Sequence, residues 1–196
     1  MQASGDAPRG DVTSLFVSWR HGDAAAFDAL FSALYGELRV LAHRQAMREQ
    51  RDDTLRTTAL VNEAYLRLVD GERLAVGDRG HFLALAARVM RNVLVDRARE
   101  RGRQKRGGEL RRVELDDELA GTSPAASDVL AVDAALERLA RLDARQAEVA
   151  HMRVFGGMTV EEVAEVLGVS TPTIKRDWRK ARMFLLHELN LGPDAA

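Results

Sequence analysis

The chain has 196 residues, a formal net charge of −1 and no cysteine. That length allows one ordinary domain or two small ones, and the missing cysteine excludes disulfides, thiolate catalysis and cysteine-ligated zinc. Near-neutrality argues against a protein that coats nucleic acid over its whole surface, but it permits a local basic patch. No apolar run approaches the roughly 20 residues that span a bilayer, and residues 1–10 lack the apolar segment of a signal peptide. We therefore expect a disordered N-terminus at residues 1–10 and a soluble, intracellular, cytoplasmic protein.

Apolar residues at helical spacing dominate the first half of the chain, which shows no sustained alternation typical of strands. Leu15, Phe16 and Trp19 indicate a short helix, and Asp23 can cap a longer one over residues 24–46. The apolar positions of the longer helix recur every three or four residues. We therefore expect one continuous helix there, with one buried face.

Two more helices are predicted in this half. Thr57 or Thr58 can cap the segment TTALVNEAYLRLVD, and after a loop at residues 71–81 the segment HFLALAARVMRNVLVDRARER resumes the helical spacing. Because each of the four predicted helices carries one apolar face, we expect them to share a core. They would form a first domain over residues 11–106.

The middle of the chain has a different composition. Residues 107–127 contain Gly, Ser, Pro and an acidic cluster without a helical period, which predicts a linker. Helical spacing returns near Asp128 and continues over a second domain at residues 128–190, followed by a tail at residues 191–196. The predicted fold class is all-α, with two small helical domains joined by a flexible acidic linker.

Two segments of the second domain carry capping-box sequences. Asp143 with Gln146, and Thr159 with Glu162, have the spacing at which each side chain can satisfy a free backbone donor of a helix's first turn. We therefore expect a helix to begin at each of these places.

The segment after the second box has the order of a helix-turn-helix. Gly168 suits the tight turn after a short helix, Val169 can fill the corner between two helices, and Ser170 can cap the second helix. Pro172 falls in the first turn, where a missing N–H costs nothing. The second helix is predicted to bury Ile174, Trp178, Ala181, Leu185 and Leu189.

The face opposite this apolar stripe is cationic. A solvated basic helix is the ordinary explanation of such a run, but here the cations follow a helix N-terminus that carries small residues. A DNA major groove requires that arrangement, with phosphate contacts along the flank and base contacts from the first turn. The residues predicted to bind DNA are Thr171, Pro172, Thr173, Lys175, Arg176, Arg179 and Lys180.

A second concentration of positive charge ends the first domain. In RVMRNVLVDRARERGRQKRGG, basic residues far outnumber Asp96 and Glu100, while apolar residues form the opposite face. A solubilising helix end, with arginines that complement the helix dipole, is the simpler interpretation. Two such surfaces in one chain favour a polyanionic partner instead. We therefore expect the protein to meet DNA at two separate places.

The sequence offers no catalytic chemistry. The five histidines are dispersed, and none stands at ligand spacing from a second histidine or a carboxylate. His187 lacks the second histidine of a zinc-protease helix. We therefore expect no enzyme, no metal site and no cofactor.

Three segments together resemble one family. TTALVNEAYLRLVDG, HFLALAARVMRNVLVDRARERGRQKRGG and LDARQAEVAHMRVFGGMTVEEVAEVLGVSTPTIKRDWRKAR occur in the order and at the spacing of bacterial RNA polymerase sigma factors of the extracytoplasmic-function (ECF) group. The chain is most similar to the subgroup whose region 2 helix reads TALVNEAYLRL. The resemblance implies a sigma factor that binds core RNA polymerase and promoter DNA and directs transcription initiation. It also implies an anti-sigma factor as a candidate partner.

The resemblance assigns roles to both domains. The first would be region 2, which binds core polymerase and recognises and melts the −10 element, and the second would be region 4, which reads the −35 element. The linker would thread the polymerase cleft. Polymerase contacts are expected from Asn62, Glu63 and Arg67. Contacts to the −10 element are expected from His81, Arg88, Arg91, Asn92 and Arg97.

Two other functions fit parts of the sequence. A free-standing helix-turn-helix regulator would bind duplex DNA without polymerase, but it would leave NEAYLRL and the arginine-rich helix unexplained. An adaptor that only docks on polymerase would not need Lys175, Arg176 or Arg179.

Overall fold

Helices make up the regular structure of the chain wherever the structure describes it. The computed structural model describes residues 9–46, 53–69, 76–107 and 124–190, and within these ranges it contains nine helices and no strand. The predicted all-α fold class is confirmed. None of the described helices is long and apolar enough to cross a membrane.

The predicted linker lies mostly outside the described residues, since only Gly107 and the stretch 124–127 fall within them. Residues 1–8 of the predicted N-terminal segment and the predicted tail at 191–196 also lie outside. The helices in chain order are α1 (Arg9–Arg20), α2 (Ala24–Ala33), α3 (Tyr35–Ala46), α4 (Asp53–Val69), α5 (Arg79–Gly107), α6 (Pro124–Leu142), α7 (Ala144–Val154), α8 (Val160–Leu167) and α9 (Thr171–Asn190).

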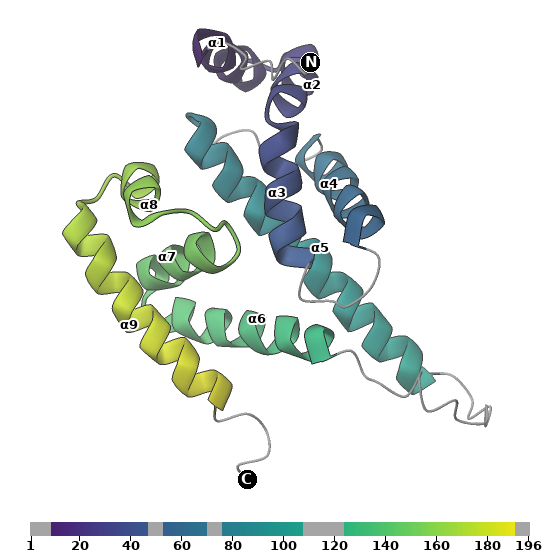
Figure 1. Cartoon of the computed structure of the whole chain (residues 1–196), viewed down its shortest axis with the longest axis vertical. Helices are drawn as coiled ribbons and strands as arrows, with labels where there is room; N and C mark the ends of the chain where they lie inside the picture. The colour runs from purple at the N-terminus through teal and green to yellow at the C-terminus, as the bar shows by residue number, and fades with distance from the viewer. Residues whose placement is uncertain (1–8, 47–52, 70–75, 108–123, 191–196) are drawn as a thin grey trace, which may run out of the picture.

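The long helix α5 lies at the centre of the arrangement. It packs against α3 and α4, which belong to the first half of the chain (α1–α5), and against α6, α7 and α8, which belong to the second half (α6–α9) (Figure 1). The end of α3 also reaches the second half, because the Gln45 side chain donates to Phe155 O at 3.1 Å. The two halves therefore meet along α5 and the end of α3.

The core of the first half is built around aromatic side chains. Phe82 of α5 is fully buried, and its ring centroid lies 5.9 Å from those of Phe16 and Trp19. The ring of Phe27 from α2 packs 5.2 Å from Trp19. Burying one such side chain contributes about 1.5–3 kcal/mol relative to exposure, so this cluster fixes the start of α5 against α1 and α2.

The helix expected over residues 24–46 is in fact two helices. The chain bends at Leu34, with φ −98° and ψ 5°, although the bonds Leu34 N to Leu30 O and Leu38 N to Leu34 O, both 3.0 Å, continue through the bend. The bend keeps Leu34 buried while α2 packs on α1 and α3 packs on α4 and α5. Tertiary packing therefore breaks a helix that its apolar period alone would continue.

Two other helix starts differ from the prediction. Helix α4 begins at Asp53, ahead of the expected cap at Thr57 or Thr58, and Thr57 is buried inside the bundle. Helix α6 begins at Pro124 rather than near Asp128, which suits proline because its missing N–H has no helical partner at a first position.

Helix α5 begins at Arg79, inside the predicted loop at residues 71–81. The carboxylate of Asp78 accepts a hydrogen bond from the backbone N–H of His81 at 2.9 Å. An aspartate that accepts from a first-turn N–H stabilises a helix start. His81 therefore belongs to the first turn of α5 and not to a loop.

The second half contains two smaller apolar clusters. One joins α6, α7 and α9, and the other joins α7, α8 and α9. Within the predicted stripe on α9, Ile174, Ala181 and Leu185 are buried and Trp178 is partly buried. The prediction is wrong for Leu189, which is 39 % exposed in the last turn of the helix.

Two of the apolar clusters contain residues from both halves of the chain. Val129 of α6 belongs to the core of the first half, and Ala84 of α5 belongs to the cluster formed by α7, α8 and α9. The division into a domain at 11–106 and another at 128–190 therefore stays a prediction, and the two parts pack together along α5.

Candidate nucleic-acid interface

The helix-turn-helix formed by α8 and α9 has the predicted local geometry. Thr159 and Glu162 form a full capping box, in which Thr159 N–H donates to Glu162 Oε2 at 2.7 Å and Glu162 N–H donates to Thr159 Oγ1 at 3.1 Å. Gly168 ends α8 in the left-handed region, with φ 63° and ψ 31°, a conformation that a Cβ disfavours. The turn then returns Val169 N–H to Ala164 O at 3.1 Å.

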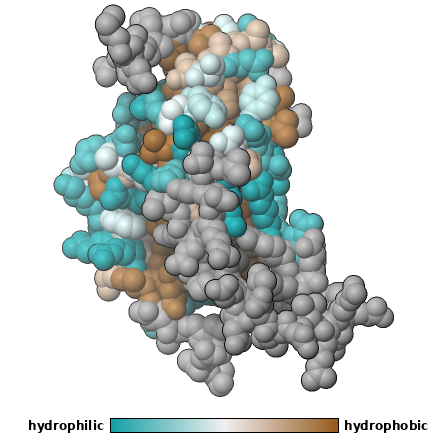
Figure 2. Space-filling view, turned by 45° about the vertical axis from the view of Figure 1, so that its right-hand side comes forward, coloured by the Kyte–Doolittle hydropathy of each residue, from teal (hydrophilic) through white to brown (hydrophobic). Residues whose placement is uncertain are grey.

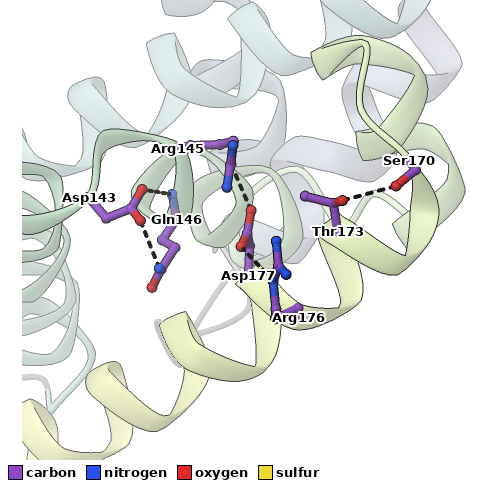
Figure 3. Close-up of polar contacts among 7 residues, drawn as sticks. All are labelled: Asp143, Arg145, Gln146, Ser170, Thr173, Arg176 and Asp177. Carbon is purple, nitrogen blue, oxygen red and sulfur yellow. Dashed lines mark hydrogen bonds and ion pairs between the residues drawn. The ribbon is translucent and has the colours of Figure 1, made fainter.

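The other predicted capping box forms only in part. Asp143 Oδ1 accepts from Gln146 N–H at 3.0 Å, as expected of a cap. The Gln146 side chain, however, donates to Asp143 Oδ2 at 2.8 Å instead of accepting from the Asp143 N–H (Figure 3). That N–H already donates to Leu139 O at 2.8 Å, so the second bond of the box has no donor left.

Ser170 stands directly before α9. Its Oγ lies 2.9 Å from Thr173 Oγ1 (Figure 3), and its carbonyl oxygen accepts from Ile174 N–H at 3.1 Å. The hydroxyl pair and the first helical hydrogen bond both position the first turn of α9, where the small predicted DNA contacts lie.

The seven residues predicted on α9 come together in its first three turns. Helix α9 buries Ile174 against α7 and α8 and Ala181 against α6 and α7, so its cations lie on the outer side. The cations and Pro172 are exposed and the two threonines are half-buried, in the set Thr171, Pro172, Thr173, Lys175, Arg176, Arg179 and Lys180.

Asp177 is a structural residue of this helix that the sequence reasoning did not single out. It is 2 % exposed and accepts from Arg145 Nε of α7 at 2.7 Å (Figure 3). Arg176 Nε lies 4.0 Å from its other oxygen, and the Arg176 side chain is 56 % exposed. The burial of Asp177 could have been predicted from its position between Ile174 and Trp178, on the buried side of the helix. Its negative charge thus faces α7 and not the outer cationic surface.

The predicted −10 residues on α5 do not all share one side. His81, Arg88 and Asn92 are seven and four residues apart, which places them near one face of a helix with 3.6 residues per turn. Arg91 lies at the edge of this face. Arg97 is about two and a half turns from Arg88 and therefore projects from the opposite side.

Two of these arginines are engaged by carboxylates of the second half. Arg88 pairs with Glu148 of α7, and Arg91 pairs with Asp133 of α6. The Arg91 side chain is 14 % exposed and that of Asp133 is 7 % exposed. Asp133 also accepts from Arg99 Nη2 at 3.1 Å. Unlike the α9 cations, Arg91 is therefore largely removed from solvent.

A buried histidine lies behind these ion pairs. His151 is 3 % exposed and stacks on Phe155 with ring centroids 5.6 Å apart. Its burial, together with the charges of Arg91 and Arg88, lowers the pKa of His151 to about 3. The ring is therefore neutral at physiological pH, and its protonation would oppose this packing.

The residues predicted to contact polymerase lie on α4. Arg67 Nη1 lies 2.9 Å from Asp96 Oδ2 of α5, and Arg67 Nε lies 3.5 Å from Glu63 Oε1. Asn62 is exposed and lines a shallow hollow with Tyr35 of α3 and residues of α2. Asn62 therefore borders α2 and α3, whereas Glu63 and Arg67, one turn apart, lie toward α5.

The sequence reasoning missed the exposed apolar residues of α4. Leu66 is 59 % exposed and Val69 is 38 % exposed, at helical spacing from Asn62. In Figure 2, which brings the right-hand side of Figure 1 forward, hydrophobic patches lie among hydrophilic surface toward the upper end. The exposure of Leu66 could have been predicted from the sequence, because Leu66 does not lie on the helix face that carries the buried Val61, Ala64 and Leu68.

Among the residues that the structure describes, no group of three or more His, Asp or Glu side chains is placed to hold a metal ion. The cationic faces of α9 and α5 are the features that stand out, and both suit a polyanion rather than a small substrate.

The sequence matches a known family over nearly its whole length. The family model described as "ECF sigma factor" matches residues 9–191, which is nearly the whole chain and includes every helix from α1 to α9. No curated protein matches the chain at a significant level.

Proposed function

The chain belongs to the ECF sigma factor family, and on that basis we propose that α9 and α5 divide the recognition of a promoter between them. As a sigma factor, the protein directs promoter-specific transcription initiation, with core RNA polymerase and promoter DNA as its partners. The observation that carries the proposal is the outward cationic face of α9, on a helix-turn-helix in which the capping box of α8 and the turn at Gly168 are both formed.

Helix α9 would read the −35 element. Thr171 and Thr173 lie in its first turn, where side chains can reach base edges in the major groove. Arg176 and Arg179 lie one turn further along the outer face, where they can bind backbone phosphates. The ion pair between buried Asp177 and half-exposed Arg145 supports this role because it links α9 to α7.

Helix α5 would lie along the −10 element. His81, Arg88 and Asn92 share a side of the helix, and Arg91 borders it. Phe82 next to His81 is fully buried in the core, so His81 is the member of that pair able to meet an unstacked base. A pocket for a flipped base can offset an opening cost of a few kcal/mol. Arg97 would contact DNA only from the other side of the helix.

The exposed side of α4 would dock on core polymerase. Asn62, Glu63 and Arg67 supply polar groups, and Leu66 adds an apolar contact between them. Exposed apolar residues ringed by polar ones are typical of a protein-binding surface. This mixture supports a docking role over that of a merely solvated helix.

The finer assignments belong to the same proposal. Residues 11–106 would act as region 2, residues 128–190 as region 4, and residues 107–127 as the acidic connector in the polymerase cleft. The segment TALVNEAYLRL would place the chain in the subgroup that shares it. The protein would act without catalysis of its own, and an anti-sigma factor would be a further partner.

Run-off transcription with purified core polymerase and a pool of promoter fragments tests this function. We expect transcripts that depend on the added chain, and a stable complex of chain and core polymerase in gel filtration at low salt. The absence of that complex would overturn the assignment. Tight duplex binding without any effect on core polymerase would instead favour a free-standing helix-turn-helix regulator.

A further inference from the structure

A cavity lies where α3 and the start of α5 meet the α7–α8 turn and α8. Its volume is about 420 Å³, which falls in the range of about 300–1,000 Å³ that small-molecule sites occupy. The described residues that line it include none of those predicted to bind DNA or polymerase. Small-molecule sites form preferentially where two domains meet, so this cavity is a candidate for a ligand of its own.

The deeper part of the lining is apolar. Leu41 and Met158 are buried there, and Leu83 and Val166 are partly buried. Val40 also lines the cavity and is 51 % exposed. A ligand with an apolar part would remove this surface from water, which favours binding.

Three glycines shape the cavity. A Cβ on Gly80 would lie 2.9 Å from Val166 Cγ2, and a Cβ on Gly157 would clash with the guanidinium of Arg44. These two glycines therefore let the walls approach each other. Gly36 of α3 has a different effect, because a Cβ there would meet nothing within 4 Å. Packing does not require glycine at this position, and its missing side chain leaves the cavity open.

The rim of the cavity is charged, and the protein already engages most of these charges. Six of the described side chains that line it are charged. Arg79 Nε donates to Glu37 Oε1 at 3.0 Å, and Asp78 accepts from the His81 N–H at 2.9 Å. Glu162 completes the capping box of α8. Four of the six charged groups are thus held by the fold itself.

The two charged side chains that remain have opposite signs and stand on different helices. Arg44 belongs to α3 in the first half, Glu165 belongs to α8 in the second half, and both are exposed. Among the residues that the structure describes, neither side chain has a hydrogen-bond or ion-pair partner. A guanidinium binds a carboxylate well, and a carboxylate accepts hydrogen bonds from an ammonium group. A ligand that satisfies both therefore carries one group of each kind.

We propose that this cavity binds a small zwitterion of the amino-acid class. Its carboxylate faces Arg44, its ammonium group faces Glu165, and its apolar side chain covers the apolar part of the lining. A simple anion or a simple cation would satisfy only one of the two groups. Because the ligand binds the folded chain, it raises the stability of that state by mass action. The site goes beyond the proposed function, since its ligand is neither DNA nor polymerase.

Calorimetric titration and thermal unfolding of the full chain test the ligand class, with L-leucine and L-phenylalanine as probes. We expect a saturable rise in Tm with at least one of them. L-leucine should bind about tenfold more tightly than 4-methylpentanoate, which lacks the ammonium group, or 3-methylbutylamine, which lacks the carboxylate, because each analogue loses one charge-assisted contact. Equal binding of leucine and its analogues, or no binding of either amino acid at about 10 mM, would overturn the proposal.

Substitution of the two unpaired charges tests their roles. Arg44→Gln and Glu165→Gln should each weaken binding of the amino acid by about tenfold. The matched controls are Arg39→Gln on α3 and Glu161→Gln on α8, which remove the same charges from exposed positions outside the lining. We expect both controls to bind like the native chain. Losses equal to those of the cavity variants would reflect net charge alone and would overturn the site.

A third variant fills the cavity without removing a charge. Leucine favours a helix more than glycine does, and the space at Gly36 is open, so Gly36→Leu should fold with an unchanged or higher Tm. Its side chain would occupy the place of the ligand, and we expect binding of the amino acid to fall more than about tenfold. Full affinity in this variant would overturn the assignment to this cavity. Duplex and polymerase binding without added amino acid report separately on the proposed function.

Discussion

The two arginine-rich helices look alike in sequence but differ in their surroundings. Helices α9 and α5 each place cations opposite an apolar stripe. On α9, the acid among the cations, Asp177, is turned inward to Arg145, and the cations face outward. On α5 the acids that pair with Arg88, Arg91 and Arg99 come from the second half of the chain, and Arg91 is largely buried against Asp133. Charge density along a helix therefore predicts a basic face but not whether that face is available.

The largest expected effect is a difference in duplex DNA affinity between variants of α9 and variants of α5. Arg176→Ala/Arg179→Ala should weaken the free protein's binding to a selected −35 duplex by about 100-fold, because each lost phosphate or base contact costs about 1–3 kcal/mol. Arg88→Ala/Arg91→Ala should change the same binding by less than about twofold, since those side chains pair with Glu148 and Asp133. Fluorescence anisotropy measures both, and a similar loss in both variants would erase the distinction.

For the free energy of unfolding we expect the reverse order, with the larger loss in the α5 variant. Arg91→Ala leaves Asp133 buried with only Arg99 beside it, and we expect the free energy of unfolding to fall by about 2 kcal/mol. Arg176→Ala removes an exposed side chain and should change it by less than about 0.5 kcal/mol. Urea unfolding followed by circular dichroism measures both values. Equal costs would mean that the environment of Arg91 is no different from a surface site.

A third variant tests whether either helix is linked to polymerase docking. Asn62→Ala/Glu63→Ala should weaken binding to core polymerase by about tenfold, which is the usual cost of losing one or two interface contacts. Duplex binding by α9 should not change. Glu161→Ala, an exposed acid on α8, is the control for lost charge. Weaker duplex binding in Asn62→Ala/Glu63→Ala would show that the docking and DNA surfaces are not separate.

The smallest expected effect concerns pH. His151 is neutral in the folded protein, where its pKa is about 3, and it regains an ordinary pKa near 6.5 on unfolding. The unfolded chain therefore binds more protons below about pH 6.5, so the free energy of unfolding falls as pH drops. Between pH 7 and 5.5 this amounts to about 1 kcal/mol.

The variant His151→Leu isolates that contribution. It should lose the His151 part of the pH dependence and keep whatever the other titratable groups supply. The charges of Arg88 and Arg91 on α5 act on this ring. We expect their ion pairs with Glu148 and Asp133 to persist in the variant, because neither pair involves the imidazole. Identical pH slopes in the two proteins would contradict the burial of a neutral histidine at this interface.

Local sequence predicted those features that depend on neighbours in the chain. The box of Thr159 and Glu162, the left-handed turn at Gly168 and the inward Ile174 all depend on residues within one or two turns, and the structure has each of them. The Asp143 box failed in one bond because the Asp143 N–H was already taken by Leu139 of the preceding helix. Even a local motif can thus be altered by the element before it.

Contacts between distant residues were not predictable in this way. The bend at Leu34 follows from how α2 and α3 pack on other helices. The ion pairs between α5 and the second half join residues 34 to 60 positions apart. A single sequence shows that Asp133 and Glu148 are acidic and helical. It does not show that they meet arginines of α5. The candidate surfaces could therefore be predicted, but their accessibility could not.

The carboxylates of α6 and α7 can also be regarded as counterions that the chain carries with it. When DNA binds an ordinary basic surface, small cations leave the DNA, and affinity falls steeply as salt rises. On α5, a phosphate would replace the carboxylate of Glu148 or Asp133, and the ion pair that this carboxylate makes with its arginine also weakens as salt rises. Single-strand binding through α5 should then respond less steeply to salt than duplex binding through α9, so that ionic strength shifts the balance between the two steps of promoter recognition.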